Sequence, residues 1–378
     1  MAYRFSIHDS IEQIDKALWN GYCPNDNPFL EYDFLQTLEL SGSVGTPESG
    51  WLPRHIQIDE GGQSVGFLPL YEKHDSYGEY IFDWGWANAA MQAGIPYYPK
   101  LVSAIPFTPV TGSRLLSLPE QKPDILNHLK PFLLNHIETN AYSSAHILFM
   151  SKEEQSLWGK DSFKPRLAQQ FHWQNQGWAK YDEYLQALRS STRKQVRKER
   201  RQAQQACDHI VMKVGEEISA EEWRIVEKLY MKTIREKHAI PYLSPKFFEL
   251  IKSAFSHRII CSLAYIDNQI VAAGLFYYKQ DRLFGRYWGS FIDAPFLHFE
   301  LCYYKPIEWA LEHGINYFEA GAQGTHKLKR GLLPTKCYSA HHIAHPALAA
   351  GVYRFIEHEQ AMVQDQILQL NKHVPFKS

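Results

Sequence analysis

Apolar residues along the chain fall into short strand-like runs separated by turns, and the same order of elements occurs twice. In the first half, residues 63–71 (QSVGFLPLY) and 79–86 (EYIFDWGW) predict two strands joined by a turn at residues 74–78. In the second half, residues 269–278 (QIVAAGLFYY) and 282–289 (RLFGRYWG) predict a matching pair. We expect each pair to form a β-hairpin.

A helix and a further strand follow each predicted hairpin. Residues 122–139 carry apolar side chains at helical spacing and lead to a strand at 145–150. Residues 298–313 similarly lead past Gly314, a helix stop, to a strand at 315–321. The repeat predicts two similar lobes with mixed α/β sheets, although the same alternation is common in α/β proteins that contain no duplication.

Two further helices are expected outside the repeated elements. Residues 182–206 place Leu185, Leu188, Val196 and Ala203 at near-helical spacing, and residues 348–370 show a similar pattern. The chain is then expected to divide into a first lobe, a linker with a long basic helix, a second lobe and a terminal helix, at residues 1–160, 161–210, 211–345 and 346–378.

Composition and charge exclude several classes of protein. The 378 residues are 45% hydrophobic, so the chain is not disordered. Forty Lys and Arg against 41 Asp and Glu give a net charge of −1, so no whole-molecule field favours nucleic acid or a membrane. Five scattered cysteines suit neither a disulfide framework nor a zinc knuckle. With no secretory signal and no run of 18 apolar residues, we expect a soluble, cytoplasmic protein.

The common catalytic and nucleotide-binding motifs are absent from the sequence. It contains no GxSxG, GxGxxG, GxxxxGK[ST] or HExxH, which argues against an α/β-hydrolase, a Rossmann dehydrogenase, a P-loop enzyme and a zincin. His341, His342 and His345 form a cluster, but no Cys or carboxylate stands beside them at zinc spacing. We expect no metal centre.

The first segment with candidate chemistry is residues 105–116 (IPFTPVTGSRLL). Pro106 and Pro109 fix the backbone and Gly112 permits a left-handed turn, which predicts a rigid loop. The loop would present hydroxyls and a guanidinium to an anionic or carbonyl-bearing ligand through Thr108, Thr111, Ser113 and Arg114. The alternative is a well-packed connection in which Arg114 serves a structural ion pair.

A second segment, residues 286–304 (RYWGSFIDAPFLHFELCYY), begins a helix near Pro295. His298 and Glu300 stand two residues apart there, so on a helix they point away from one another and need separate roles. His298 has the only side chain of this segment whose ordinary pKa is near neutrality. It is either a general base or a buried core histidine.

The third segment is residues 317–334 (YFEAGAQGTHKLKRGLLP). Apolar strand residues surround Glu319, and burial raises the pKa of a carboxylate towards that of a useful general base. Gly321 and Gly324 allow a tight turn into a short helix capped by Thr325. The helix start, with Lys327, Lys329 and Arg330, would attract an anion. The alternative is an ordinary turn with exposed basic residues.

A fourth segment, residues 193–201 (RKQVRKERR), has six basic residues in nine. Such a helix face can contact the phosphates of RNA or of a nucleotide-linked substrate. The balanced overall charge and the lack of interleaved aromatics favour the alternative, a solvated helix face.

These four segments resemble the signature blocks of a known family. PFTPVTGSRLL, STRKQVRKER, RYWGSFIDAPFLHFELCYY and FEAGAQGTHKLKRGLLP look like those of the predicted N-acyltransferases of the peptidoglycan biosynthesis/recognition family. That family is related to the Fem aminoacyltransferases and belongs to the GNAT superfamily. The resemblance covers about Pro28 to His342, and four separated blocks in the right order are more specific than one short motif.

The resemblance implies two GNAT-like lobes and acyl or aminoacyl transfer to an amine. It points to a site facing the second lobe, formed by Arg286, Trp288, His298, Glu300, Glu319, Gln323, His326, Lys327 and Arg330. Glu319 or His298 would be the base, and the turn from Gly321 to Lys327 would hold an anionic donor or acceptor.

One departure concerns the acyl donor. The usual GNAT pyrophosphate loop does not occur cleanly in either lobe, and GAQGTHK is a loose analogue of it. The donor is therefore either acyl-CoA or aminoacyl-tRNA, and the acceptor a small-molecule amine, peptidoglycan-related or another metabolite. A catalytically silent GNAT-like module that binds a cell-wall precursor or a protein is the alternative function.

Overall fold

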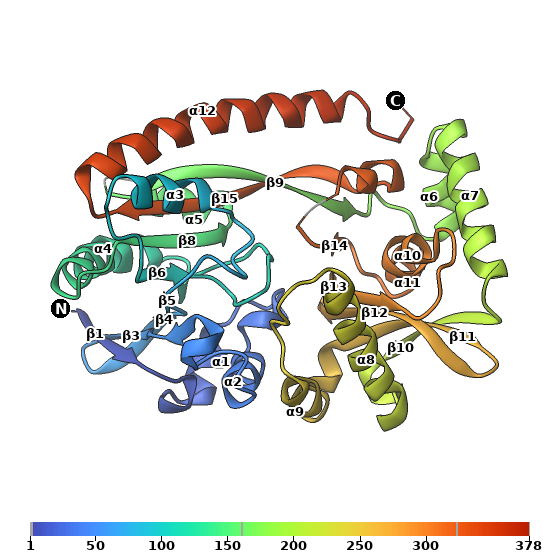
Figure 1. Ribbon diagram of the computed structural model, residues 1–378, viewed down its shortest axis with the longest axis horizontal. Coiled ribbons are helices and arrows are strands. Elements are labelled where there is room, and N and C mark those ends of the chain that lie inside the picture. The colour runs from blue at the N-terminus through green and yellow to red at the C-terminus, as the bar shows by residue number, and fades with distance from the viewer. Residues whose placement is uncertain (1–2, 160–161, 323, 378) are drawn as a thin grey trace. The chain divides into compact units, whose positions relative to one another are not determined.

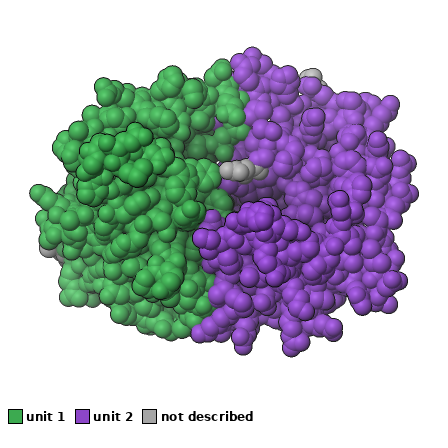
Figure 2. Space-filling view, viewed as in Figure 1, with its two compact units in different colours: residues 1–24, 29–169, 336–366 green, residues 25–28, 170–335, 367–378 purple. Residues whose placement is uncertain are grey.

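The computed structural model describes residues 3–159, 162–322 and 324–377. The chain divides into two compact units, coloured separately in Figure 2. Unit 1 comprises Met1–Pro24, Phe29–Gln169 and Lys336–Gln366, and unit 2 comprises Asn25–Pro28, Gln170–Thr335 and Ile367–Ser378. The predicted linker, residues 161–210, is thus divided between the two units at Gln169.

Unit 1 contains strands and helices in mixed order (Figure 1). Its strands are β1 (Tyr3–His8), β2 (Trp51–Pro53), β3 (His55–Glu60), β4 (Gln63–Leu68), β5 (Tyr71–Lys73), β6 (Lys100–Ser103), β7 (Leu116–Ser117) and β8 (Ser144–Met150). Its helices are α1 (Lys16–Tyr22), α2 (Tyr32–Leu40), α3 (Trp84–Gln92), α4 (Lys122–Thr139) and α5 (Lys152–Trp158). Strand β9 (Lys164–Gln174) leads out of unit 1, and β15 (Leu333–Ile343) and α12 (Pro346–Asn371) return to it.

The strands of unit 1 pair in two groups. One is the antiparallel order β1-β3-β4-β7. In the other, β8 pairs antiparallel with β15 and parallel with β6, and β5 joins β6 to β2. Helix α4 buries Leu126, Leu129, Leu133 and Ile137, three to four residues apart, against the apolar side chains of these strands. The predicted helix at 122–139 and strand at 145–150 are confirmed.

Unit 2 has one sheet and a group of helices. The strands are β10 (His209–Val214), β11 (Ile259–Ile266), β12 (Gln269–Lys279), β13 (Arg282–Ser290) and β14 (Tyr317–Glu319). The helices are α6 (Tyr181–Ala187), α7 (Ser190–Gln205), α8 (Ala220–Glu236), α9 (Pro245–Phe255), α10 (Leu297–Phe299) and α11 (Lys305–Glu312), with a π-helical turn at Glu300–Tyr304 and a 3₁₀ helix at Thr325–Arg330.

The sheet of unit 2 has the order β10-β11-β12-β13-β14-β9. Neighbours are antiparallel except β13 and β14, which are parallel. Strands β12 and β13 pair from Lys279 with Arg282 to Ala272 with Ser290, so the predicted second hairpin is confirmed. The helix expected at 298–313 is also confirmed, beginning at Leu297, and the strand expected at 315–321 is the shorter β14.

The predicted first hairpin is wrong. Strand β4 pairs with the preceding strand β3, and residues 79–83 form no strand. Glu79 and Asp83 instead turn inwards to the buried ammonium of Lys100, and α3 begins at Trp84. The apolar run that suggested a strand contains the two carboxylates that neutralise this lysine.

The single long helix expected at residues 182–206 is divided into α6 and α7, and the predicted basic run lies entirely within α7. Leu188 is extended between α6 and α7 and bridges to Phe376, and the Arg189 backbone N–H donates to the Pro375 carbonyl. Helix α7 buries Val196 and Ala203 within unit 2, so it belongs to the core of that unit. The terminal helix expected at 348–370 is confirmed as α12.

Candidate active site

The chain between β13 and α11 forms one side of the candidate site in unit 2. After Ser290 it turns into α10 through Phe296, whose φ of 64° is left-handed. Bulky residues rarely adopt this conformation, and strained backbone of this kind clusters at functional sites. Pro295 lies just before this residue, one step outside the helix turn predicted for it.

A cavity of about 560 Å³ lies beside this turn. Its walls are the last turns of α8, the end of β13 and the start of α10, and its lining residues are Lys232, Thr233, Glu236, Lys237, Trp288, Ser290, Phe291, Ile292, Asp293, Ala294, Phe296, Leu297, His298 and Phe299. The volume lies within the roughly 300–1,000 Å³ usual for small-molecule sites.

Helix α8 is fixed in register against this cavity. Ser219 and Glu222 form a reciprocal capping box at its start, which defines where the helix begins. The Thr233 hydroxyl donates to the Trp288 carbonyl at 2.9 Å, which ties α8 to β13. A Cβ at Gly289 would lie 2.4 Å from the Leu229 carbonyl oxygen, so only glycine permits this close packing.

His298 is the one histidine among the described residues that line the cavity. Its ring lies 4.7 Å from the Trp288 ring and 5.5 Å from that of Tyr303. Burial, then the positive charges of His326 and Arg330, lower the pKa of His298 to about 4. The imidazole is therefore neutral at pH 7 and able to accept a proton.

Three basic residues of the Thr325–Arg330 helix lie close to this ring. The His326 ring is 6.3 Å from that of His298, and its Nε2 is 3.1 Å from the Tyr303 hydroxyl. The Arg330 guanidinium stacks 3.3 Å from the centre of the Phe299 ring. Burial lowers the pKa of Lys327 to about 8, and its ammonium donates to the Gly321 carbonyl. Two candidates of the third segment, His326 and Arg330, thus adjoin residues that line the cavity.

Gly324 precedes this short helix with a φ of 112°, which few other residues adopt. A Cβ at this position would lie 2.5 Å from Cε1 of His326, so a larger residue would displace that ring. Thr325 is the first residue of the helix rather than its cap, contrary to prediction. Gln323 lies outside the described residues.

Glu319 ends β14 and is buried, with 2% exposure. Its Oε2 lies 3.8 Å from Nε2 of His172, whose pKa burial lowers to about 3. His172 is therefore neutral at pH 7, and the contact is not an ion pair. Glu319 is not among the side chains that line the 560 Å³ cavity.

Glu300 has a position that favours a structural role over the predicted catalytic one. It is fully buried and accepts N–H bonds of 2.9–3.1 Å from the Arg200 guanidinium and one of 3.2 Å from Gln204. Arg200 also pairs with Glu308. The carboxylate of Glu300 therefore anchors the π-helical turn to α7.

The predicted ligand-binding residues of the first lobe lie in unit 1 and serve its backbone. Arg114 is fully buried and its guanidinium donates to the carbonyls of Val110, Leu148 and Phe149. The Thr108 hydroxyl donates to the Pro106 carbonyl, and Thr111 is half-buried in the same loop. The contacts fit the packed connection that was the alternative interpretation, although these hydrogen bonds of the Arg114 guanidinium go to backbone carbonyls and not to the carboxylate expected there.

Sequence reasoning missed the α8 side of the cavity. Thr233 and Lys237 stand in an ordinary amphipathic helix, and no local motif distinguishes them. Asp293 lies two residues before Pro295, in a segment that the sequence selected as a candidate, but Asp293 itself was not predicted to line a site. Trp288 was predicted and lines the cavity, while Arg286, also predicted, lies two residues earlier on β13 with its guanidinium 5.3 Å from the Tyr287 ring. Within the described residues, no three His, Cys, Asp or Glu side chains form a metal-binding group.

In unit 2 the antiparallel strands β10 to β13 are followed by α10, α11 and the parallel strand β14, and the fold as a whole is mixed α/β. The family model FemAB-like, described as peptidoglycan biosynthesis/recognition, matches residues 10–378. The chain belongs to this family, as its four sequence blocks predicted.

Solved structures show the same fold. The crystal structure of FemX has a TM-score of 0.55 at 13% identity, covering 93% of this chain and 100% of FemX. L-PGS from Bacillus licheniformis has a TM-score of 0.52 at 12% identity, covering 90% of this chain and 97% of that one. The C-terminal domain of a putative lysylphosphatidylglycerol synthetase from Agrobacterium fabrum gives 0.53 at 11% identity, with 93% and 95% covered. None of the curated proteins matches the sequence.

Membership of the FemAB-like family makes the protein an acyl- or aminoacyltransferase at the level of the family. Among the described residues, no helix combines the length and the apolar character needed to cross a bilayer.

Proposed function

We propose that this chain transfers an acyl or aminoacyl group to a small-molecule amine at the 560 Å³ cavity of unit 2. The donor is acyl-CoA or aminoacyl-tRNA, and the acceptor is a peptidoglycan-related or other small metabolite. The observation that carries the proposal is the neutral His298 ring in the wall of a cavity large enough for both reacting groups.

The proposed reaction requires a proton acceptor. When an amine attacks the donor carbonyl, a C–N bond forms and the nitrogen carries a positive charge until it loses a proton. A His298 ring with a pKa of about 4 is a weak base. It is therefore better suited to remove the proton from the acidic N–H of the tetrahedral intermediate than from the less acidic ammonium of the unreacted substrate. The carbonyl re-forms, the donor's thiolate or ribose oxygen leaves, and His298 returns the proton to that oxygen or sulfur.

The cavity lining offers both apolar and charged contacts to the two substrates. Phe291, Phe296 and Phe299 supply apolar walls, while Lys237 and Asp293 supply charges of both signs. A carboxylate such as Asp293 suits an ammonium-bearing acceptor, and a lysine suits the phosphates or carboxylates of a donor. The basic face of α7 supports the tRNA donor, since Arg197 and Arg201 carry no ion pair among the described residues.

A donor screen tests the proposal. Acyl-CoA thioesters and charged tRNAs are offered to the full chain with amine acceptors, and amide formation is followed by mass spectrometry. Turnover that falls in His298→Gln, with ligand binding retained, supports the assignment. Binding without turnover for every donor would instead establish the catalytically silent module. Met362→Leu, a change at an exposed residue of unit 1 that lines neither this cavity nor the one in unit 1, is the control variant and should turn over as wild type does.

A further inference from the structure

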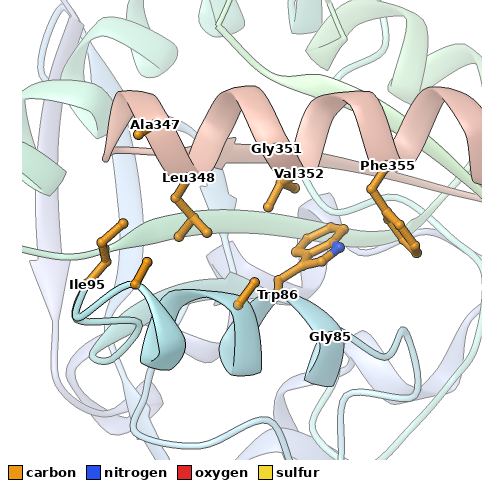
Figure 3. A pocket seen from close by; sticks show the side chains of 10 residues that line it. Gly85, Trp86, Ile95, Ala347, Leu348, Gly351, Val352 and Phe355 are labelled. Atoms are coloured by element: carbon orange, nitrogen blue, oxygen red, sulfur yellow. The ribbon is translucent and has the colours of Figure 1, made fainter.

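A second cavity, of about 440 Å³, lies in unit 1 between α3 and the first part of α12 (Figure 3). Its lining contains no charged side chain among the described residues. The lining residues are Gly85, Trp86, Ala89, Ala93, Ile95, Ala347, Leu348, Gly351, Val352 and Phe355. None of them lines the candidate active site in unit 2, so this cavity is a separate site.

Small residues keep the cavity open along both helices. Gly85, Ala89 and Ala93 follow one another at intervals of four on the α3 side, as do Ala347 and Gly351 on α12. A Cβ at Gly85 or Gly351 would meet no atom within 4 Å, and neither glycine has a left-handed backbone. Neither packing nor backbone geometry therefore requires glycine there, although a larger side chain would fill the cavity.

Trp86 supplies a buried donor in the wall of this cavity. The residue is 4% exposed, and its indole Nε1 has no hydrogen-bond partner among the described residues. Buried tryptophan N–H groups usually find a hydrogen-bond partner. Figure 3 shows the indole nitrogen on the side of Phe355, which is 49% exposed and so has room to turn into solvent. A ligand with a hydrogen-bond acceptor would satisfy this donor.

The surroundings of Trp86 determine the charge of that ligand. The Arg166 guanidinium stacks 4.6 Å from the indole ring, but its charge is already neutralised, since it forms two bonds of 2.6 and 2.8 Å with Glu359. The lining itself offers no cation to compensate a buried carboxylate. Burying an unpaired charge is far more costly than burying a hydrogen-bonded carbonyl, so the acceptor must be uncharged.

We propose that this cavity binds an uncharged aliphatic chain ending in an amide or ester carbonyl, which accepts a hydrogen bond from Nε1 of Trp86. The lining residues from Gly85 to Ala93 span eight helical steps, or about 12 Å. At ordinary C–C bond lengths that distance accommodates an extended chain of roughly eight to ten carbons. The site is separate from the proposed transferase activity and requires no covalent step.

Calorimetry of the full chain with octanamide tests the proposal. Wild-type protein is expected to bind one equivalent. Gly351→Leu, which fills the cavity without a clash, should weaken binding at least tenfold, and Trp86→Phe, which removes only the N–H and its ring edge, should weaken it about three- to tenfold. Ala350→Leu, which introduces the same side chain at an exposed position on the same helix, should bind as wild type does. Each variant is first checked for an unchanged melting temperature.

Three results with wild type and Gly351→Leu would overturn the proposal, and a fourth comes from His298→Gln. They are an absence of octanamide binding to wild type, equal binding by wild type and Gly351→Leu, and octanoate binding at pH 8 as tight as that of octanamide. Because binding rather than turnover is measured, failure here leaves the proposed function in unit 2 untouched. His298→Gln should bind octanamide normally, and loss of binding in that variant would locate the ligand in unit 2 instead.

Discussion

Replacing Glu300 by glutamine distinguishes a structural carboxylate from a catalytic one. The substitution keeps the size of the side chain and removes its charge. In the folded protein Glu300 is fully buried and accepts bonds from Arg200 and Gln204, so the variant leaves a guanidinium with one carboxylate fewer. We expect loss of stability with little direct effect on chemistry.

The size of the loss follows from what Arg200 retains. Removing one partner of a buried ion pair costs about 3–5 kcal/mol when the other charge is left uncompensated. Arg200 still has Glu308 and stacks 4.4 Å from the Tyr181 ring, and the side-chain oxygen of the substituted glutamine can still accept a hydrogen bond. We therefore expect a loss of about 2–3 kcal/mol of unfolding free energy, equivalent to roughly 4–12 °C in Tm for a unit of this size.

Urea denaturation monitored by circular dichroism measures this loss as a shift of the midpoint at constant slope. Glu308→Gln is a matched control, because Glu308 is 22% exposed and shares the same guanidinium, and it should cost less than about 1 kcal/mol. The structural assignment is refuted if Glu300→Gln keeps wild-type stability and loses transferase activity, since that outcome makes Glu300 a catalytic residue.

Three further outcomes are expected. His298→Gln should lower kcat by about 10²–10⁴ without changing Tm. Because the pKa of His298 is lowered to about 4, the wild-type rate should not fall between pH 7 and pH 6. Stopped assays from pH 4 to 8 measure the rates of both proteins, and thermal denaturation measures Tm. The folded-state pKa values of His172 and His298 lie below 6.5, so at acidic pH the unfolded chain binds more protons than the folded chain. The free energy of unfolding should therefore be lower at pH 5 than at pH 7 by about 2 kcal/mol for each histidine. Urea denaturation at the two pH values measures this difference. Joint replacement of Arg193, Arg197 and Arg201 by Gln should weaken tRNA binding and reduce its salt slope by up to about 2–3 units, whereas an unchanged slope returns α7 to the solvated-face interpretation.

Local patterns predicted the elements whose partners are close in sequence. The β12–β13 hairpin has two apolar runs joined by a turn at residues 280–281, so its pairing is contained in one continuous segment. The α4 helix is similarly marked by its own apolar spacing. The β4 strand was recognised, but its partner β3 precedes it, and the apolar run after it is diverted by the contacts of Glu79 and Asp83 with Lys100.

Contacts between distant segments explain the other errors. The break at Leu188 depends on pairing with Phe376, close to the other end of the chain, which no spacing within 182–206 reveals. In the candidate site, His298 and Trp288 were predicted from one segment and do line one cavity, while Thr233 and Lys237 join them only through the packing of α8 on β13. Arg114 was predicted to bind a ligand, but its guanidinium donates hydrogen bonds to backbone carbonyls that come from a segment distant in sequence and from its own loop.

The order in which the chain leaves the ribosome has a bearing on how unit 1 forms. Ser144 on β8 pairs with Ile343 on β15, and the unit also requires α12 up to Gln366. At about 5–20 residues per second, roughly 10–40 s of synthesis separate these two strands. Throughout that interval the edge of β8 that accepts β15 is unpaired, so nascent chains are exposed to mispairing and to chaperones at this strand. A stop codon anywhere from residue 190 to residue 366 would therefore remove parts of both units rather than one.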